Sequence, residues 1–139
     1  MNMRNFAGTH QLLWVALLLL GSAGTVFGAA PRMEIFYLPH RPAMAVVSQI
    51  ERVVADYPQL VVKKYSFDDP AAAELLEKYQ LRSHMPVAIF IDGRNNFEID
   101  GRRISLRNFP KGDAFVPTFA GEWDYADLRR ILRTEQGQR

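Results

Sequence analysis

Apolar residues in the first part of the chain occur at two spacings, which predict a strand and then a helix. Residues 33–38 read M-E-I-F-Y-L and predict a short apolar strand. From Pro42 to Val54, apolar positions recur three and four residues apart, which predicts an amphipathic helix that begins at Pro42. Proline suits the first helical position because the N–H that it lacks has no partner there. Tyr57-Pro58 ends this helix.

The middle of the chain repeats the order of strand and helix. Residues 60–67 predict a second strand, and the following Asp68-Asp69-Pro70 provides an acidic cap for a helix over 71–79. The continuous apolar run at 87–91 predicts a buried strand. A turn at 92–96 then leads into one antiparallel partner strand, whose apolar positions are Phe97, Ile99, Ile104 and Leu106.

The last third of the chain consists of a long link and a final helix. Residues 101–122 are punctuated by proline and glycine, and irregular links of this length are often functional. Apolar spacing predicts a helix over 124–133, and 136–139 are expected to form a frayed tail. Strands that alternate with helices predict an α/β fold, with a single domain over 31–135.

The N-terminal segment has the layout of an export signal. Arg4 is its only charged residue, and an uncharged apolar run leads into the small residues of 21–30. This order is typical of a secretory signal peptide, here with cleavage after Gly28 or Ala30. The alternative is an uncleaved membrane anchor, because 12–30 has about the length of a tilted span. Under either alternative, residues 1–30 place the domain outside the cytoplasm, in the periplasm or secreted.

Charge does not indicate a nucleic-acid partner. Beyond residue 28 the sequence has sixteen lysines and arginines against fifteen acidic residues. One modest basic cluster predicts a solvated edge strand rather than a binding patch; it comprises Arg94, Arg102, Arg103, Arg107 and Lys111. The sequence contains no cysteine, so packing rather than a disulfide must hold the exported domain together.

Residues 33–101 resemble a thioredoxin-like domain. The resemblance rests on three stretches in the order and spacing of that family: M-E-I-F-Y-L-P-H-R-P-A-M at 33–44, the helix of 71–79, and Q-L-R-S-H-M-P with the strand and glycine turn of 80–93. It implies a three-layer α/β sandwich, in which helices flank a central mixed sheet of about four strands. It also implies a cis Met85–Pro86 bond that faces the start of the first helix.

The resemblance also locates a site that has lost its chemistry. In thioredoxin-like proteins a C-x-x-C motif joins the first strand to the first helix, and Arg41 and Met44 stand at its two cysteine positions. Thiol–disulfide exchange needs an attacking thiolate and a resolving thiol. Ile35 replaces the acid that many thioredoxins bury, and the sequence contains no G-x-S-x-G motif or phosphate-binding glycine loop. We therefore expect no enzymatic activity and no catalytic residue.

These exclusions leave a non-catalytic binding or accessory module for a protein partner. In thioredoxin-like proteins the groove beside the cis-proline holds an extended chain by backbone hydrogen bonds. The resemblance therefore implies a groove at Met85 and Pro86. The aromatic residues of the 109–123 loop either cover the core or extend this groove toward a partner; they are Phe109, Phe115, Phe119 and Trp123.

The alternative function is copper(I) handling. Imidazole and thioether groups are suitable copper(I) ligands. The resemblance brings two His/Met pairs toward each other, namely His40 and Met44 with His84 and Met85. In the other interpretation the two methionines fill the volume of the missing cysteines and the histidines lie on the surface. No cofactor is expected in that case.

Overall fold

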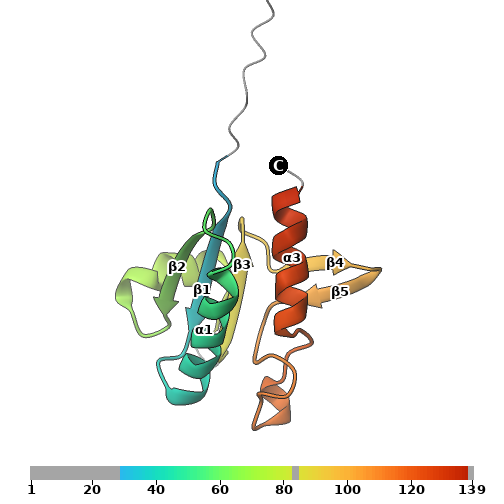
Figure 1. Cartoon of the computed structure of the whole chain (residues 1–139). Helices are drawn as coiled ribbons and strands as arrows, with labels where there is room; N and C mark the ends of the chain where they lie inside the picture. The colour runs from blue at the N-terminus through green and yellow to red at the C-terminus, as the bar shows by residue number, and fades with distance from the viewer. Residues whose placement is uncertain (1–28, 83–84, 138–139) are drawn as a thin grey trace, which may run out of the picture.

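The computed structural model describes residues 29–82 and 85–137 as a mixed α/β fold (Figure 1). Strand β1 (Arg32–Tyr37) lies at the centre of a three-stranded sheet with the order β2-β1-β3. It pairs in parallel with β2 (Val61–Ser66) and antiparallel with β3 (Val87–Ile91). This mixed sheet confirms the predicted α/β class.

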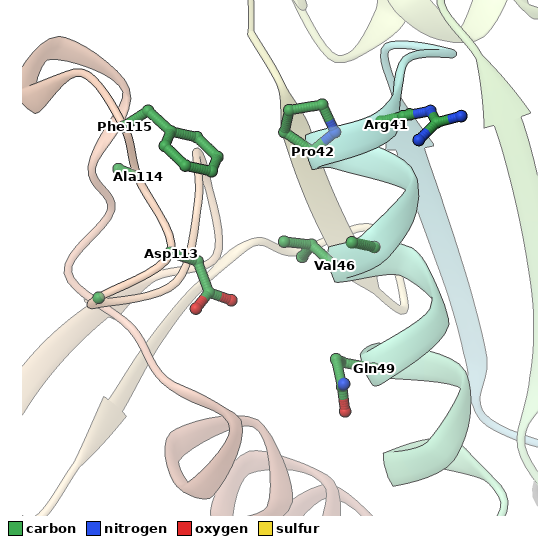
Figure 2. Close-up of a pocket in the computed structure, with 9 residues that line it drawn as sticks. Arg41, Pro42, Val46, Gln49, Asp113, Ala114 and Phe115 are labelled. Atoms are coloured by element: carbon green, nitrogen blue, oxygen red, sulfur yellow. The ribbon is translucent and has the colours of Figure 1, made fainter.

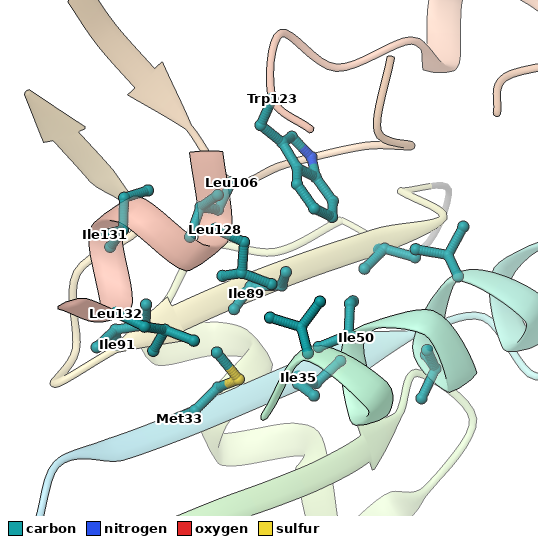
Figure 3. Packing of buried hydrophobic residues seen from close by; sticks show 14 of the residues in the cluster. Met33, Ile35, Ile50, Ile89, Ile91, Leu106, Trp123, Leu128, Ile131 and Leu132 are labelled. Carbon is teal, nitrogen blue, oxygen red and sulfur yellow. The ribbon is translucent and has the colours of Figure 1, made fainter. Parts of the chain in front are cut away.

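Helices cover both faces of this sheet. Helices α1 (Arg41–Val54) and α3 (Tyr125–Gly137) pack on the face that carries Ile35 (Figure 3). Successive side chains of a strand point to opposite faces, so Phe36 lies on the other face. There it packs against residues of the segment that contains a 3₁₀ turn, η1 (Pro70–Ala72), and the helix α2 (Ala73–Lys78). The sheet therefore lies between two helical layers.

The two layers enclose two clusters of buried side chains. Figure 3 shows Ile35 and Ile89 of the sheet packed against Ile50 of α1 and Leu128 of α3, all of them fully buried. On the opposite face the buried residues are Phe36, Ala88 and Phe90, and the ring of Tyr79 stacks on that of Phe90 with centroids 3.9 Å apart.

The structure corrects the predicted partner strand of β3. The segment after β3 forms two strands, β4 (Asn96–Ile99) and β5 (Arg102–Ser105), which pair with each other as a separate two-stranded sheet. The central sheet of the described residues thus has three strands rather than about four, and β4 and β5 bring the total to five. Asp100 and Gly101 both have positive φ, at 52° and 73°, and two such residues form the tight turn that separates β4 from β5.

The last helix extends farther than predicted. Helix α3 continues to Gly137, two residues into the tail expected at 136–139. Arg94 Nη2 lies 2.5 Å from Glu135 Oε2, and this ion pair ties the last turns of α3 to the turn after β3. Residues 138 and 139 lie outside the described residues.

Residues 1–28, on which the export prediction rests, also lie outside the described residues. Among the helices that the structure describes, none combines the length and the apolar character needed to cross a membrane. The described chain begins at Ala29 without regular secondary structure and leads into β1.

Candidate functional site

The 109–123 loop is fixed to the core at both of its ends. Trp123 is fully buried, and its Nε1 donates to the carbonyl oxygens of Arg107 and Asn108, at 3.2 Å each. Phe109 is buried as well, with 5 % of its surface exposed. A buried indole whose N–H has acceptors combines a large apolar contact with a fixed orientation. These contacts hold both ends of the loop against the core.

Gly121 allows the two ends of the loop to approach each other. Its N–H donates to the carbonyl oxygen of Phe109 at 2.7 Å. A Cβ atom at this position would lie 2.4 Å from the carbonyl oxygen of Arg107 and 2.7 Å from that of Phe109. Backbone segments this close leave room for glycine alone.

A buried carboxylate connects the loop to α3. Asp127 Oδ2 accepts from the backbone N–H of Asp124 at 3.2 Å, and Asp124 Oδ1 accepts from the N–H of Asp127 at 2.8 Å, which forms a reciprocal helix cap. Asp127 Oδ1 also lies 2.6 Å from Arg102 Nη2, and its Oδ2 lies 3.8 Å from Lys111 Nζ. Because Arg102 belongs to β5 and Lys111 to the loop, one carboxylate joins three elements.

The four loop aromatics divide into buried and exposed residues. Phe109 and Trp123 belong to the core, so the hypothesis that they contact a partner is wrong, because their side chains have almost no exposed surface. Phe119 is partly buried against the same core. Phe115, in contrast, is 82 % exposed. The loop tip around Phe115 is therefore the part that a partner can reach.

A groove of about 560 Å³ lies between this loop tip and α1 (Figure 2). Its helix wall is mainly apolar and includes Pro42 and Val46, and its loop wall is formed by residues 112–115. Figure 2 shows the ring of Phe115 facing Pro42 across the gap, with Val46 directed toward the loop. The carboxylate of Asp113 points into the same gap. The groove thus joins apolar walls to one acidic group.

Tyr125, the first residue of α3, holds the acidic group in place. Its hydroxyl donates to Asp113 Oδ2 at 2.9 Å. Burial, followed by this hydrogen bond and the charge of Asp113, raises the pKa of Tyr125, so its hydroxyl stays a neutral donor. Sequence analysis did not single out this pair, because it joins two segments whose approach depends on the folding of the loop.

The two positions that the thioredoxin resemblance aligns with C-x-x-C, Arg41 and Met44, both lie in the first turn of α1. The helix begins at Arg41, so Pro42 occupies its second position rather than the first. His40 is the N-cap residue, but its side chain makes no capping hydrogen bond. Arg41 lines the groove, although Figure 2 shows its guanidinium directed away from the loop. Met44 is half exposed.

The structure contradicts the predicted cis-proline. The described residues, which include Met85 and Pro86, contain no cis peptide bond, so the bond between these two residues is trans. The Pro86 carbonyl oxygen accepts from the N–H of Leu38 at 3.0 Å, which continues the antiparallel pairing of β1 with β3. The N–H of Met85 donates to the carbonyl oxygen of Arg82 at 3.2 Å. These two backbone groups thus pair within the chain, and the groove at this proline stays a prediction.

The structure describes only three of the four residues of the hypothetical copper(I) site. His84 lies outside the described residues. Met85 is partly buried and packs against the cluster of Phe36 and Phe90, whereas His40 and Met44 are exposed at the start of α1. The described residues contain no group of three or more histidine and acidic side chains arranged to hold a metal ion. The copper site stays a prediction.

Sequence analysis missed a buried acid on the opposite face of the sheet. Glu34 is 4 % exposed, and its Oε2 accepts a hydrogen bond of 2.5 Å from the hydroxyl of Tyr79. Burial, followed by this hydrogen bond, raises the pKa of Tyr79 to about 12. The sequence signal for this buried acid is an acidic residue within the otherwise apolar strand of residues 33–38. Glu34 lies in β1 and contacts Tyr79 just after α2, so its side chain faces the α2 layer and not the groove.

Comparison with known proteins finds no family model, curated protein or solved structure that matches the chain. The thioredoxin-like assignment therefore stays a prediction from the sequence. The function is therefore inferred from the groove, from the loop that is anchored beside it, and from the charged residues that line it.

Proposed function

We propose that this protein is an exported, non-catalytic binding module of thioredoxin-like architecture, which holds an extended segment of a protein partner between α1 and the 109–123 loop. The exposure of Phe115 carries this proposal. Its ring is 82 % exposed on a loop whose two ends are anchored in the core. Large aromatic side chains presented beside a pocket are typical of binding sites, because their burial by a partner contributes strongly to affinity.

The polar groups of the groove suit binding better than catalysis. Arg41, Gln49 and Asp113 are the polar side chains among the residues that line it, and they include no nucleophile with a neighbouring base. The absence of cysteine from the sequence removes the residue type that thiol chemistry requires.

Two further observations support the proposed architecture and location. A mixed sheet with helices on both faces fits the sandwich that the thioredoxin resemblance implies, and α1 begins where that family has its C-x-x-C motif. The charged, apolar and small-residue order of residues 1–30 supports export. The membrane enters this proposal only through an uncleaved N-terminal segment.

Site-specific photocrosslinking tests the proposal in the full-length chain. A benzophenone amino acid replaces Phe115 in one variant and Val61 in a control variant. Val61 is also an exposed apolar residue, 46 % exposed, but it lies on the edge strand β2. We expect irradiation of intact cells to crosslink a distinct protein to position 115 and not to position 61. Absence of a crosslink at 115, or the same products from both positions, would contradict the proposed binding site.

A further inference from the structure

Two charged residues line the groove, and only the acidic one is directed into it. Figure 2 shows the carboxylate of Asp113 pointing across the gap toward α1, whereas the guanidinium of Arg41 points away from the loop. Gln49, a neutral residue, lies farther along the helix wall. A partner segment in the groove therefore meets a negative potential at Asp113.

The position of this negative charge is fixed by the protein. Tyr125 donates to Oδ2 of Asp113 at 2.9 Å. A carboxylate offers about four acceptor sites on its two oxygens, so one hydrogen bond from Tyr125 leaves capacity for a cationic donor. The fixed orientation also reduces the conformational entropy that a bound cation would have to remove from the loop.

The groove has an apolar compartment next to this charge. Phe115 and Pro42 face each other across the gap. The small side chains of Ala45 and Ala114, which also line the groove, leave space between its walls. A large apolar side chain would contact both walls there. Burial of such a side chain by Phe115 would also exclude water from Asp113, which strengthens its attraction to a neighbouring cation.

From this juxtaposition we infer that the groove selects a partner segment in which a lysine or arginine stands next to a large apolar residue. This inference rests on the proposed function and specifies its ligand. The apolar residue enters between Phe115 and Pro42, and the cation pairs with Asp113. Electrostatic complementarity of this kind contributes more to the choice of partner than to total affinity.

An array of immobilised nonapeptides with randomised flanks tests the inference. Its fixed central pair is Phe–Lys, Phe–Glu or Ala–Lys, and the probe is the purified protein. We expect wild-type protein to bind Phe–Lys peptides about fivefold or more better than Phe–Glu peptides, with a preference that shrinks as salt is raised. Asp113→Asn keeps an acceptor for Tyr125 and removes the charge, so it should abolish this preference. Asp56→Asn, an exposed acid beyond the end of α1, is the matched control and should leave it unchanged.

The outcomes separate this inference from the proposed function. Equal binding of Phe–Lys and Phe–Glu peptides by the wild type, no binding of either, or a preference that survives Asp113→Asn would each overturn the inference about charge. The crosslink at position 115 tests the groove separately: if it forms there and not at position 61, the groove remains a binding site whatever the peptide array shows. Absence of that crosslink would overturn the proposed function itself.

Discussion

The hydroxyl of Tyr125 and the carboxylate of Asp113 join the first turn of α3 to the wall of the groove through a hydrogen bond of 2.9 Å. The ring of Tyr125 also packs edge-on against buried Trp123, with ring centroids 5.8 Å apart. Tyr125 thus contacts both the anchored end of the loop and its acidic tip. The groove depends on this residue although it does not line it.

Tyr125→Phe removes the hydrogen bond and keeps the ring. We expect the free energy of unfolding to fall by about 0.5–1.5 kcal/mol, the usual net contribution of one hydrogen bond. Urea denaturation measures this change. An unchanged free energy of unfolding would mean that the bond to Asp113 does not hold the loop.

The raised pKa of Tyr125 also predicts how the free energy of unfolding changes at alkaline pH. The pKa of Tyr125 is raised in the folded protein above its ordinary value of 10.0, so its contribution is fully present below pH 10 and is lost as the pH rises through the folded pKa. We expect wild-type stability to fall more steeply above pH 10 than that of Tyr125→Phe. Equal slopes for the two proteins would contradict the raised pKa.

Much of the helical and strand structure follows from local patterns. The apolar stripe of α1 and the continuous apolar run of β3 are visible in the sequence, and both elements lie close to where they are predicted. The Asp100-Gly101 dipeptide is an equally local signal for the β4–β5 hairpin, whereas the apolar positions alone predict one longer strand there. The turn chemistry of this dipeptide is thus a better guide to the hairpin than the apolar spacing around it.

The groove, in contrast, depends on contacts between distant segments. Which aromatic residue becomes an anchor and which becomes exposed is decided by the approach of residues 107–109 to residues 121–123. Phe109 and Phe115 are the same residue type in the same loop, yet one is buried and the other is 82 % exposed. Apolar spacing cannot predict this difference, because proline and glycine interrupt the loop and prevent one continuous helix there.

Gly121→Ala should disrupt the crossing of the loop ends. The added Cβ would meet two backbone carbonyl oxygens, at 2.4 Å and 2.7 Å, and backbone cannot move aside as a flexible side chain can. We expect a loss of about 1–3 kcal/mol in the free energy of unfolding. Gly137→Ala is the matched control, because nothing lies within 4 Å of its Cβ position at the end of α3. Equal effects of the two substitutions would contradict the close approach.

The thioredoxin-like assignment predicts that a disulfide can be restored. Arg41 and Met44 occupy the first turn of α1, three residues apart. The double variant Arg41→Cys with Met44→Cys should therefore oxidise to an intramolecular disulfide and resist alkylation until it is reduced. The single variant Arg41→Cys should remain reactive. A folded double variant that stays alkylatable under oxidising conditions would mean that the alignment of these two positions with C-x-x-C is wrong.

The copper(I) hypothesis predicts one tightly bound ion per chain, detected by competition with a chromophoric chelator. Met44→Leu with Met85→Leu removes both thioethers and retains most of the side-chain volume. If the site exists, this variant should lose the ion with a change in stability below about 1.5 kcal/mol. If the wild type does not compete with the chelator, the two methionines act only in packing.

Phe115 and Trp123 should respond in opposite ways to truncation. Trp123 is fully buried and donates to two carbonyl oxygens, so Trp123→Ala should lower the free energy of unfolding by about 3–5 kcal/mol. Phe115 is 82 % exposed, so Phe115→Ala should change it by no more than about 0.5 kcal/mol. Phe115→Ala should instead reduce binding of the crosslinked partner, because one anchoring aromatic residue contributes about 2 kcal/mol or more to many interfaces. Thermal melts and quantitative pull-downs of the two variants measure both effects. A large drop in melting temperature for Phe115→Ala would show that this ring supports the fold and would remove the main argument for a binding groove.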